Sequence, residues 1–79
     1  MEIKVLGTGC ANCKHLLQLV EYAVKKKEVN AKIEYITDIV EISSYALLRT
    51  PGLIINSKIV SYGRVPKLDE IEQMIEENR

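Results

Sequence analysis

Hydrophobic positions recur along this chain with two different periods, and each change of period predicts a new structural element. A short apolar run over about residues 2–6 predicts a strand. A helix is expected next, over about residues 11–28, because apolar side chains return every three or four positions. These positions are Cys13, Leu16, Leu17, Val20, Ala23 and Val24. Residues 31–37 then alternate with a period of two, which predicts a second strand.

The next predicted element is a short helix. Asp38 and Glu41 have the spacing of a helix N-cap residue and its reciprocal partner, so a helix is expected to begin there. It should continue to about Leu48 and stop before Pro51, because proline disfavours helical geometry in the residue that precedes it.

A hairpin and a final helix complete the pattern. Two apolar runs, residues 53–55 and 59–62, flank the polar turn Asn56-Ser57-Lys58. Asn-Ser is a weaker turn pair than Asn-Gly, so the sequence leaves two registers for the strand pairing, which differ by one residue. A last helix is predicted over about residues 67–77, from the helical spacing of its apolar positions. These positions are Leu68, Ile71, Met74 and Ile75.

The predicted order is therefore β-α-β-α-β-β-α. The first two strands, joined by a long helix, should be parallel with a right-handed crossover. The hairpin adds two antiparallel strands, which gives an α/β fold with a mixed four-stranded sheet flanked by three helices. At 79 residues, the chain is expected to form a single domain over residues 1–79.

The composition of the chain bears on its binding partners, its oligomeric state and its cellular location. Eleven basic residues balance eleven acidic ones, which argues against binding to nucleic acid or anionic lipid and fits a monomer. The basic run Lys25–Lys27 is expected to close the first helix, where cations suit the negative end of the helix dipole. No apolar run approaches the roughly 20 residues of a membrane span, and the first six residues do not resemble a signal peptide. A cytoplasmic location is therefore expected.

The two cysteines carry the candidate chemistry. Cys10-Ala11-Asn12-Cys13 falls where the first strand gives way to the first helix. Free N–H groups at a helix N-terminus stabilise a thiolate, which is the attacking form of cysteine. Cys13 follows one turn later on the apolar face, so it should be the more buried partner and close a disulfide with Cys10. Gly7 and Gly9 would let the preceding loop turn sharply.

This placement predicts a thiol-disulfide exchange cycle without a cofactor. Cys10 would attack a disulfide in a protein substrate, and Cys13 would then release the reduced substrate. A reductase or another electron donor must restore the dithiol.

Two other interpretations of the cysteines stay open. In the first, they are incidental buried hydrophobes; in the second, they bind a soft metal ion. Two thiolates supply half of a tetrahedral zinc site, and the single histidine, His15, is near. No second cysteine pair completes the set, so no metal site is assigned, although two thiolates suit linear copper(I). A copper- or zinc-binding protein or metallochaperone is therefore the alternative function, and His15 is expected on the solvent face of its helix.

Thr50-Pro51 is the second candidate site. Proline is tolerated at the start of a strand because it has no ladder donor to lose. Most X-Pro bonds are trans, and an ordinary helix stop is the plain interpretation. A cis bond would instead turn the main chain of Thr50 outward, where it can pair with an extended substrate segment.

Three motifs together resemble the thioredoxin superfamily, and within it the small thioredoxin-like redox-active disulfide proteins. They are Gly7-Thr8-Gly9-Cys10-Ala11-Asn12-Cys13, Thr50-Pro51-Gly52-Leu53 and Gly63-Arg64-Val65-Pro66. The resemblance spans essentially the whole chain and implies the minimal thioredoxin fold.

The resemblance also implies a role for each candidate residue. Cys10 would be the nucleophile and Cys13 the resolving thiol. Pro51 would be a cis-proline facing the disulfide, with Thr50 as its substrate-binding neighbour. Gly63 would lie beside them in the substrate groove.

The remaining residues implied by the resemblance lie around the nucleophile or behind it. The supporting loop consists of Gly7, Thr8, Gly9, Ala11 and Asn12. Lys4 stands where thioredoxins carry a buried acid, so the proton acceptor of those proteins is absent.

Overall fold

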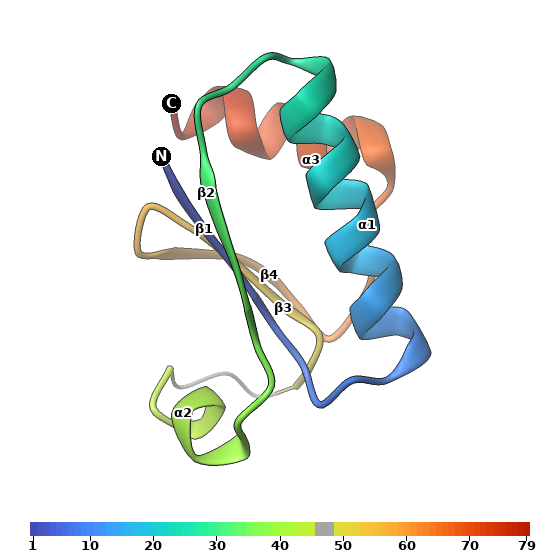
Figure 1. The fold of residues 1–79 in the computed structure, drawn as a ribbon, viewed down its shortest axis with the longest axis vertical. Helices are drawn as coiled ribbons and strands as arrows, with labels where there is room; N and C mark the ends of the chain where they lie inside the picture. Colours follow the sequence, from blue (N-terminus) through green and yellow to red (C-terminus); the bar gives the residue numbers. More distant parts are fainter. Residues whose placement is uncertain (46–48) are drawn as a thin grey trace.

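The computed structural model describes residues 1–45 and 49–79. These residues form four strands and three helices in the predicted order, and the predicted α/β fold class is confirmed (Figure 1). The elements are β1 Glu2–Leu6, α1 Ala11–Lys26, β2 Lys32–Ile36, α2 Ile39–Ser43, β3 Gly52–Ile55, β4 Lys58–Tyr62 and α3 Leu68–Glu77. None of the helices in the described part of the chain is both long and apolar enough to cross a membrane.

The strands form one mixed sheet in the order β2-β1-β3-β4. β1 runs parallel to β2 and antiparallel to β3, and β3 runs antiparallel to β4. Leu6, the last residue of β1, lies opposite Ile36 of β2 on one side and Gly52 of β3 on the other. The loop that leaves β1 and the chain that enters β3 therefore meet at the same end of the sheet.

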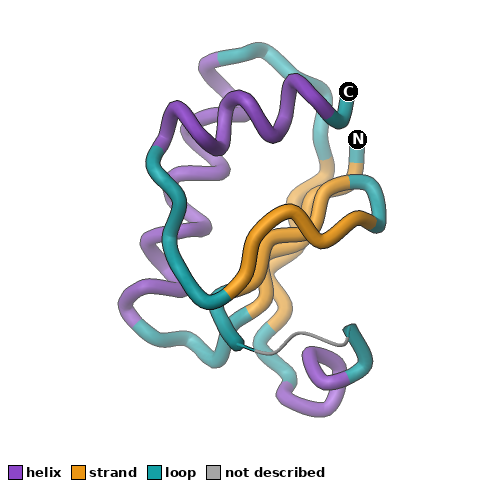
Figure 2. Tube along the Cα trace, turned by 180° about the vertical axis from the view of Figure 1, so that it is seen from behind, coloured by secondary structure: helices purple, strands orange, loops and turns teal. Residues whose placement is uncertain are grey.

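The two faces of the sheet are covered unequally. α1 and α3 pack on one face, called here the main face, and α2 lies at one end of the sheet on the other side, the α2 face (Figures 1 and 2). The main face carries the larger cluster of buried side chains, which are Ile3, Val5, Leu16, Val20, Ala23, Leu53, Ile55, Ile71 and Ile75. The α2 face carries a smaller cluster, which consists of Leu6, Ile36, Ile42 and Ile54.

α2 is shorter than the predicted helix. Its N-cap is confirmed, because the Asp38 carboxylate accepts a hydrogen bond from the Val40 N–H at 3.0 Å. The helix nevertheless ends at Ser43. The hydroxyls of Ser43 and Ser44 donate to main-chain carbonyls one turn back, at 2.7 and 2.6 Å, and such bonds compete with continuation of a helix. The predicted end at Leu48 lies outside the described residues.

The hairpin is tighter than the predicted three-residue turn. Asn56 and Ser57 both have positive φ, 49° and 68°, so a two-residue connection suffices and β4 begins at Lys58. The register shifts between Leu53 and Ile54, where the ladder is irregular. The side-chain oxygen of Asn56 also accepts from the Glu2 N–H at 2.9 Å, which fixes this turn to the start of β1.

Candidate functional site

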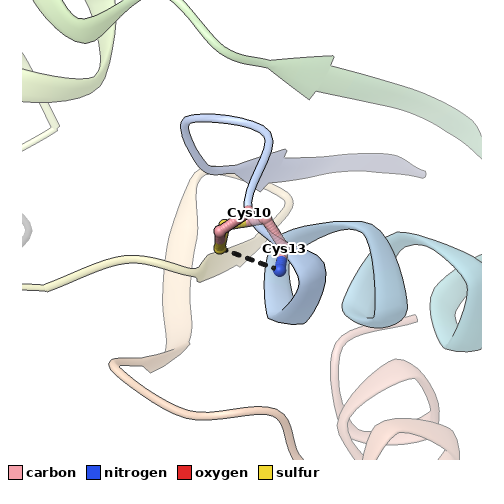
Figure 3. Close-up of a disulfide and its surroundings, with 2 residues drawn as sticks. All are labelled: Cys10 and Cys13. Carbon is pink, nitrogen blue, oxygen red and sulfur yellow. Dashed lines mark hydrogen bonds between the residues drawn. A yellow bond between two sulfur atoms is a disulfide. The ribbon is translucent and has the colours of Figure 1, made fainter.

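A disulfide joins Cys10 to Cys13 at the N-terminus of α1, with their Cα atoms 5.1 Å apart (Figure 3). Cys10 is the N-cap residue, in extended conformation, and its sulfur accepts a hydrogen bond from the Cys13 N–H at 3.2 Å. Its carbonyl accepts from the Lys14 N–H at 3.0 Å, which is the first bond of the helix. The chain therefore turns into α1 at the disulfide itself.

The two sulfurs differ in how far solvent reaches them. Cys13 is 0% exposed, as its place on the apolar face of α1 predicts, whereas Cys10 is exposed. The first turn of α1 contains no acidic side chain to oppose a negative charge. In the reduced protein, the helix N-terminus therefore favours a thiolate on the sulfur that a partner can reach.

Gly7 lets the loop pass directly against the buried sulfur. A Cβ at this position would overlap Cys13 Sγ and lie 2.6 Å from Cys13 Cβ. The Gly7 N–H donates to the Ile36 carbonyl at 2.9 Å, which extends the pairing of β1 with β2. Gly9 is needed for a different reason, since its φ of +88° lies in the left-handed region.

The other residues of the predicted loop surround the disulfide on its solvent side. Thr8, Ala11 and Asn12 are all exposed. The loop therefore leaves Cys10 open to a partner while Gly7 holds the backbone close to Cys13.

Thr50 and Pro51 lie at the same end of the sheet as the disulfide. Gly52, the first residue of β3, is paired with Leu6, the last residue of β1. Thr50 and Pro51 directly precede Gly52, so they lie near the point where the chain leaves β1 toward Cys10. Figure 3 shows the segment that leads into β3 passing beside the disulfide. The Thr50–Pro51 peptide bond is cis, the proline ring is buried and Thr50 is exposed.

Gly63 joins the same group from the other side of β3. Its N–H donates to the Pro51 carbonyl at 2.9 Å, and its φ is +76°. A Cβ at Gly63 would lie 3.2 Å from the Cβ of Arg49, so the stem of that arginine lies across the glycine. The structure thus brings all three sequence motifs together at one end of the sheet.

Comparison with known proteins agrees with this arrangement. A family model described as a thioredoxin domain matches residues 1–76. The chain belongs to the thioredoxin family.

Two relatives from archaea illustrate the match. A protein named thioredoxin from Methanothermobacter thermautotrophicus is 35% identical over 75 residues, which cover 95% of this chain and 97% of that protein. Another thioredoxin, from Methanocaldococcus jannaschii, is 34% identical over 71 residues, which cover 90% of this chain and 81% of the relative. Family membership and the Cys-x-x-Cys disulfide support thiol-disulfide oxidoreductase chemistry as the general class of function.

The Lys4 side chain is hydrogen-bonded to Tyr45, a residue that the sequence patterns did not single out. It lies between Ile3 and Val5 on β1, so its side chain projects from the α2 face. Its Nζ donates to the Tyr45 hydroxyl at 3.0 Å, and this hydrogen bond raises the pKa of Lys4 above its ordinary value. No local pattern links residues 41 positions apart, so the sequence carries no signal for this pair.

The structure also reports on His15 and on possible metal ligands. His15 is exposed on α1, as expected. Within residues 1–45 and 49–79, no three His, Cys, Asp or Glu side chains are grouped so that they could hold a metal ion.

Proposed function

We propose that this protein carries electrons to disulfides in protein substrates by cycling Cys10 and Cys13 between dithiol and disulfide. One observation carries the proposal: the two sulfurs are joined at a helix N-terminus, with Cys13 0% exposed and Cys10 open to solvent. The exposed sulfur of Cys10 is accessible to a substrate disulfide. The buried sulfur of Cys13 is left for the second step, the attack on Cys10.

The cycle has two exchange steps. The Cys10 thiolate attacks one sulfur of the substrate disulfide, which forms a mixed disulfide and releases the other substrate sulfur as a thiolate that takes up a proton. The Cys13 thiolate then attacks Cys10 Sγ and expels the second substrate thiolate. Two electrons have passed to the substrate, and the Cys10–Cys13 disulfide has formed. A reductase or another two-electron donor returns the pair to the dithiol.

Thr50, Pro51 and Gly63 are proposed to hold the substrate main chain. Thr50 is exposed and precedes β3 at the end of the sheet where the disulfide lies, so an extended segment can pair with its backbone as a short added strand. Gly63 is exposed beside Pro51, to whose carbonyl its N–H is hydrogen-bonded, and the stem of Arg49 lies against it. The loop of Gly7, Thr8, Gly9, Ala11 and Asn12 is proposed to position Cys10 for attack.

The proposal includes the setting in which this chemistry works. The protein acts as a cytoplasmic monomer with one domain and no resident cofactor. A Cys-x-x-Cys pair in a reducing compartment serves redox catalysis or metal binding rather than structure, and the balanced charge of the chain supports a monomer.

Reduction of insulin disulfides with dithiothreitol as electron donor tests the proposal. Cys10→Ser should lower the rate to that of dithiothreitol alone. When the pre-reduced protein is mixed with insulin after dithiothreitol has been removed, Cys13→Ser should accumulate a mixed disulfide on Cys10. Lys58→Gln is the matched control, because Lys58 starts β4 beside the hairpin turn, and its rate should equal that of the wild type. An unchanged rate in Cys10→Ser would contradict the proposal. So would near-stoichiometric copper or zinc in protein purified under reducing conditions.

A further inference from the structure

The segments that build the site are basic, although the chain as a whole is neutral. Residues 3–20 and 42–68 contain no acidic residue, while the full chain balances 11 basic against 11 acidic residues. The first of these segments includes the disulfide, and the second includes Thr50, Pro51 and Gly63. The basic residues they contain are Lys4, Lys14, Arg49, Lys58, Arg64 and Lys67. Two of them are exposed and close in the chain to site residues: Lys14 directly follows Cys13 in α1, and Arg49 directly precedes Thr50.

Arg49 is the basic residue most directly built into the proposed groove. It precedes Thr50 in the chain and is exposed. A Cβ at Gly63 would lie 3.2 Å from Arg49 Cβ and 3.3 Å from Cδ, so the arginine stem extends along the glycine surface. This contact holds the arginine stem against Gly63, whose N–H donates to the Pro51 carbonyl, so the side chain is anchored beside the proposed substrate-binding residues.

The charge of Arg49 is not neutralised by a neighbour. Within residues 1–45 and 49–79 it forms no ion pair. Arg64, close by in the sequence after Gly63, differs in this respect. Its two guanidinium nitrogens donate to the Glu70 carboxylate at 2.9 and 3.4 Å.

Glu70, the acidic residue that contacts the chain next to Gly63, is already paired with Arg64. The acidic residues Asp38 and Glu41 follow the opposite edge strand of the sheet. Asp38 and Glu41 follow β2, whereas the stem of Arg49 lies against Gly63, which follows β4. In the sheet order, β1 and β3 separate these two strands. The Asp38 carboxylate is moreover engaged in capping α2.

We propose that Arg49 selects disulfide substrates that carry an aspartate or glutamate next to the cysteine under attack. This inference rests on the proposed function and names the class of protein segment that the site prefers. The planar guanidinium group matches a carboxylate through paired hydrogen bonds. The surrounding positive charge accelerates the approach of an acidic segment, and this acceleration falls as salt is added.

Two fluorogenic peptide disulfides of equal length test the inference, one with glutamates flanking its cysteine and the other with glutamines. The measured quantity is the second-order rate constant for reduction by the pre-reduced protein. The wild type should favour the glutamate peptide, and the preference should shrink at high salt. Arg49→Gln should reduce the preference about two- to fivefold, the range of an exposed charge pair. Arg49→Lys should retain part of it, because the charge remains while the paired hydrogen bonds of the guanidinium group are lost.

Lys58→Gln is again the matched control, since it removes one positive charge at the end of β4 that lies away from Gly63. An equal loss of preference in Lys58→Gln and Arg49→Gln would overturn the inference. So would equal rates for the two peptides with the wild type, a result that leaves the proposed function standing. If the wild type reduces neither peptide nor insulin, both proposals fail.

Discussion

The two faces of the sheet present a contrast between a deep core and a thin one. All nine residues of the main-face cluster, between the sheet and the helices α1 and α3, are 0% exposed. On the α2 face the cluster has four buried residues, and Ile36 and Ile42 retain 6% and 7% exposure. α2 itself leaves Ile39 and Val40 exposed at 68% and 73%. The molecule thus concentrates its packing on one face of the sheet.

This contrast bears on how the site is held. Cys13 belongs to α1, a helix anchored in the deep core, so the internal exchange step is built on the best-packed part of the molecule. Thr50 follows α2 along the chain, belongs to neither buried cluster and is exposed. This arrangement is favourable for exchange, because a rigid helix positions the reacting sulfurs while a less packed segment contacts the substrate.

Truncation of one isoleucine on each face is the strongest test of the contrast. Ile71→Ala should destabilise the protein by about 2–5 kcal/mol, because a fully buried side chain leaves a cavity that the helices cannot close. Ile42→Ala should stay near the lower end, about 2 kcal/mol, because α2 can settle toward the sheet. Urea unfolding of both variants measures the difference. Equal losses would mean that the two clusters contribute alike, and would remove the contrast.

A second variant tests how closely the deep core holds the buried sulfur. Gly7→Ala places a methyl group onto Cys13 Sγ, so it should cost about 1–3 kcal/mol and lower the rate of insulin reduction. Gly9→Ala is the matched control. A Cβ there meets no atom within 4 Å, and its cost comes from the φ of +88° alone. A fully active Gly7→Ala protein of wild-type stability would show that this close approach is not required.

The local patterns of the sequence predicted most of the architecture. The element order, the parallel and antiparallel pairs and the burial of Cys13 all follow from periods of two and of three to four, which report on each residue's own neighbourhood. The N-cap role of Asp38 was predictable for the same reason. The place of the disulfide at the start of α1 also followed from chain order.

Features that depend on distant partners could not be predicted in this way. The run Lys25–Lys27 was expected to close α1, and Lys25 and Lys26 do lie in its last turn. Its second role, pairing Lys26 and Lys27 with Glu72 and Glu76 of α3, depends on how the two helices pack. The stem of Arg49 against Gly63 is likewise set by the return of β4 to the site. The early end of α2 depends on hydroxyl rotamers that no periodicity reports.

The smallest expected effect concerns the ion pairs that join the helices of the main face. The Glu76 carboxylate lies 2.9 Å from Nζ of Lys27, the C-cap residue of α1. Hydrogen bonds from Lys27 and then Arg79 hold the pKa of this carboxyl below its ordinary value. The folded protein therefore favours the ionised carboxylate of Glu76. The ion pair stabilises the fold above the ordinary glutamate pKa of about 4.3, and this stabilisation is lost as the pH falls through the lower pKa of the folded state. Glu76→Gln should lower stability at pH 7 but not at pH 2.5, measured by urea unfolding. Glu77→Gln is the control, since Glu77 forms no ion pair among the described residues, and an equal pH dependence in both variants would show that the helices pack without help from this pair.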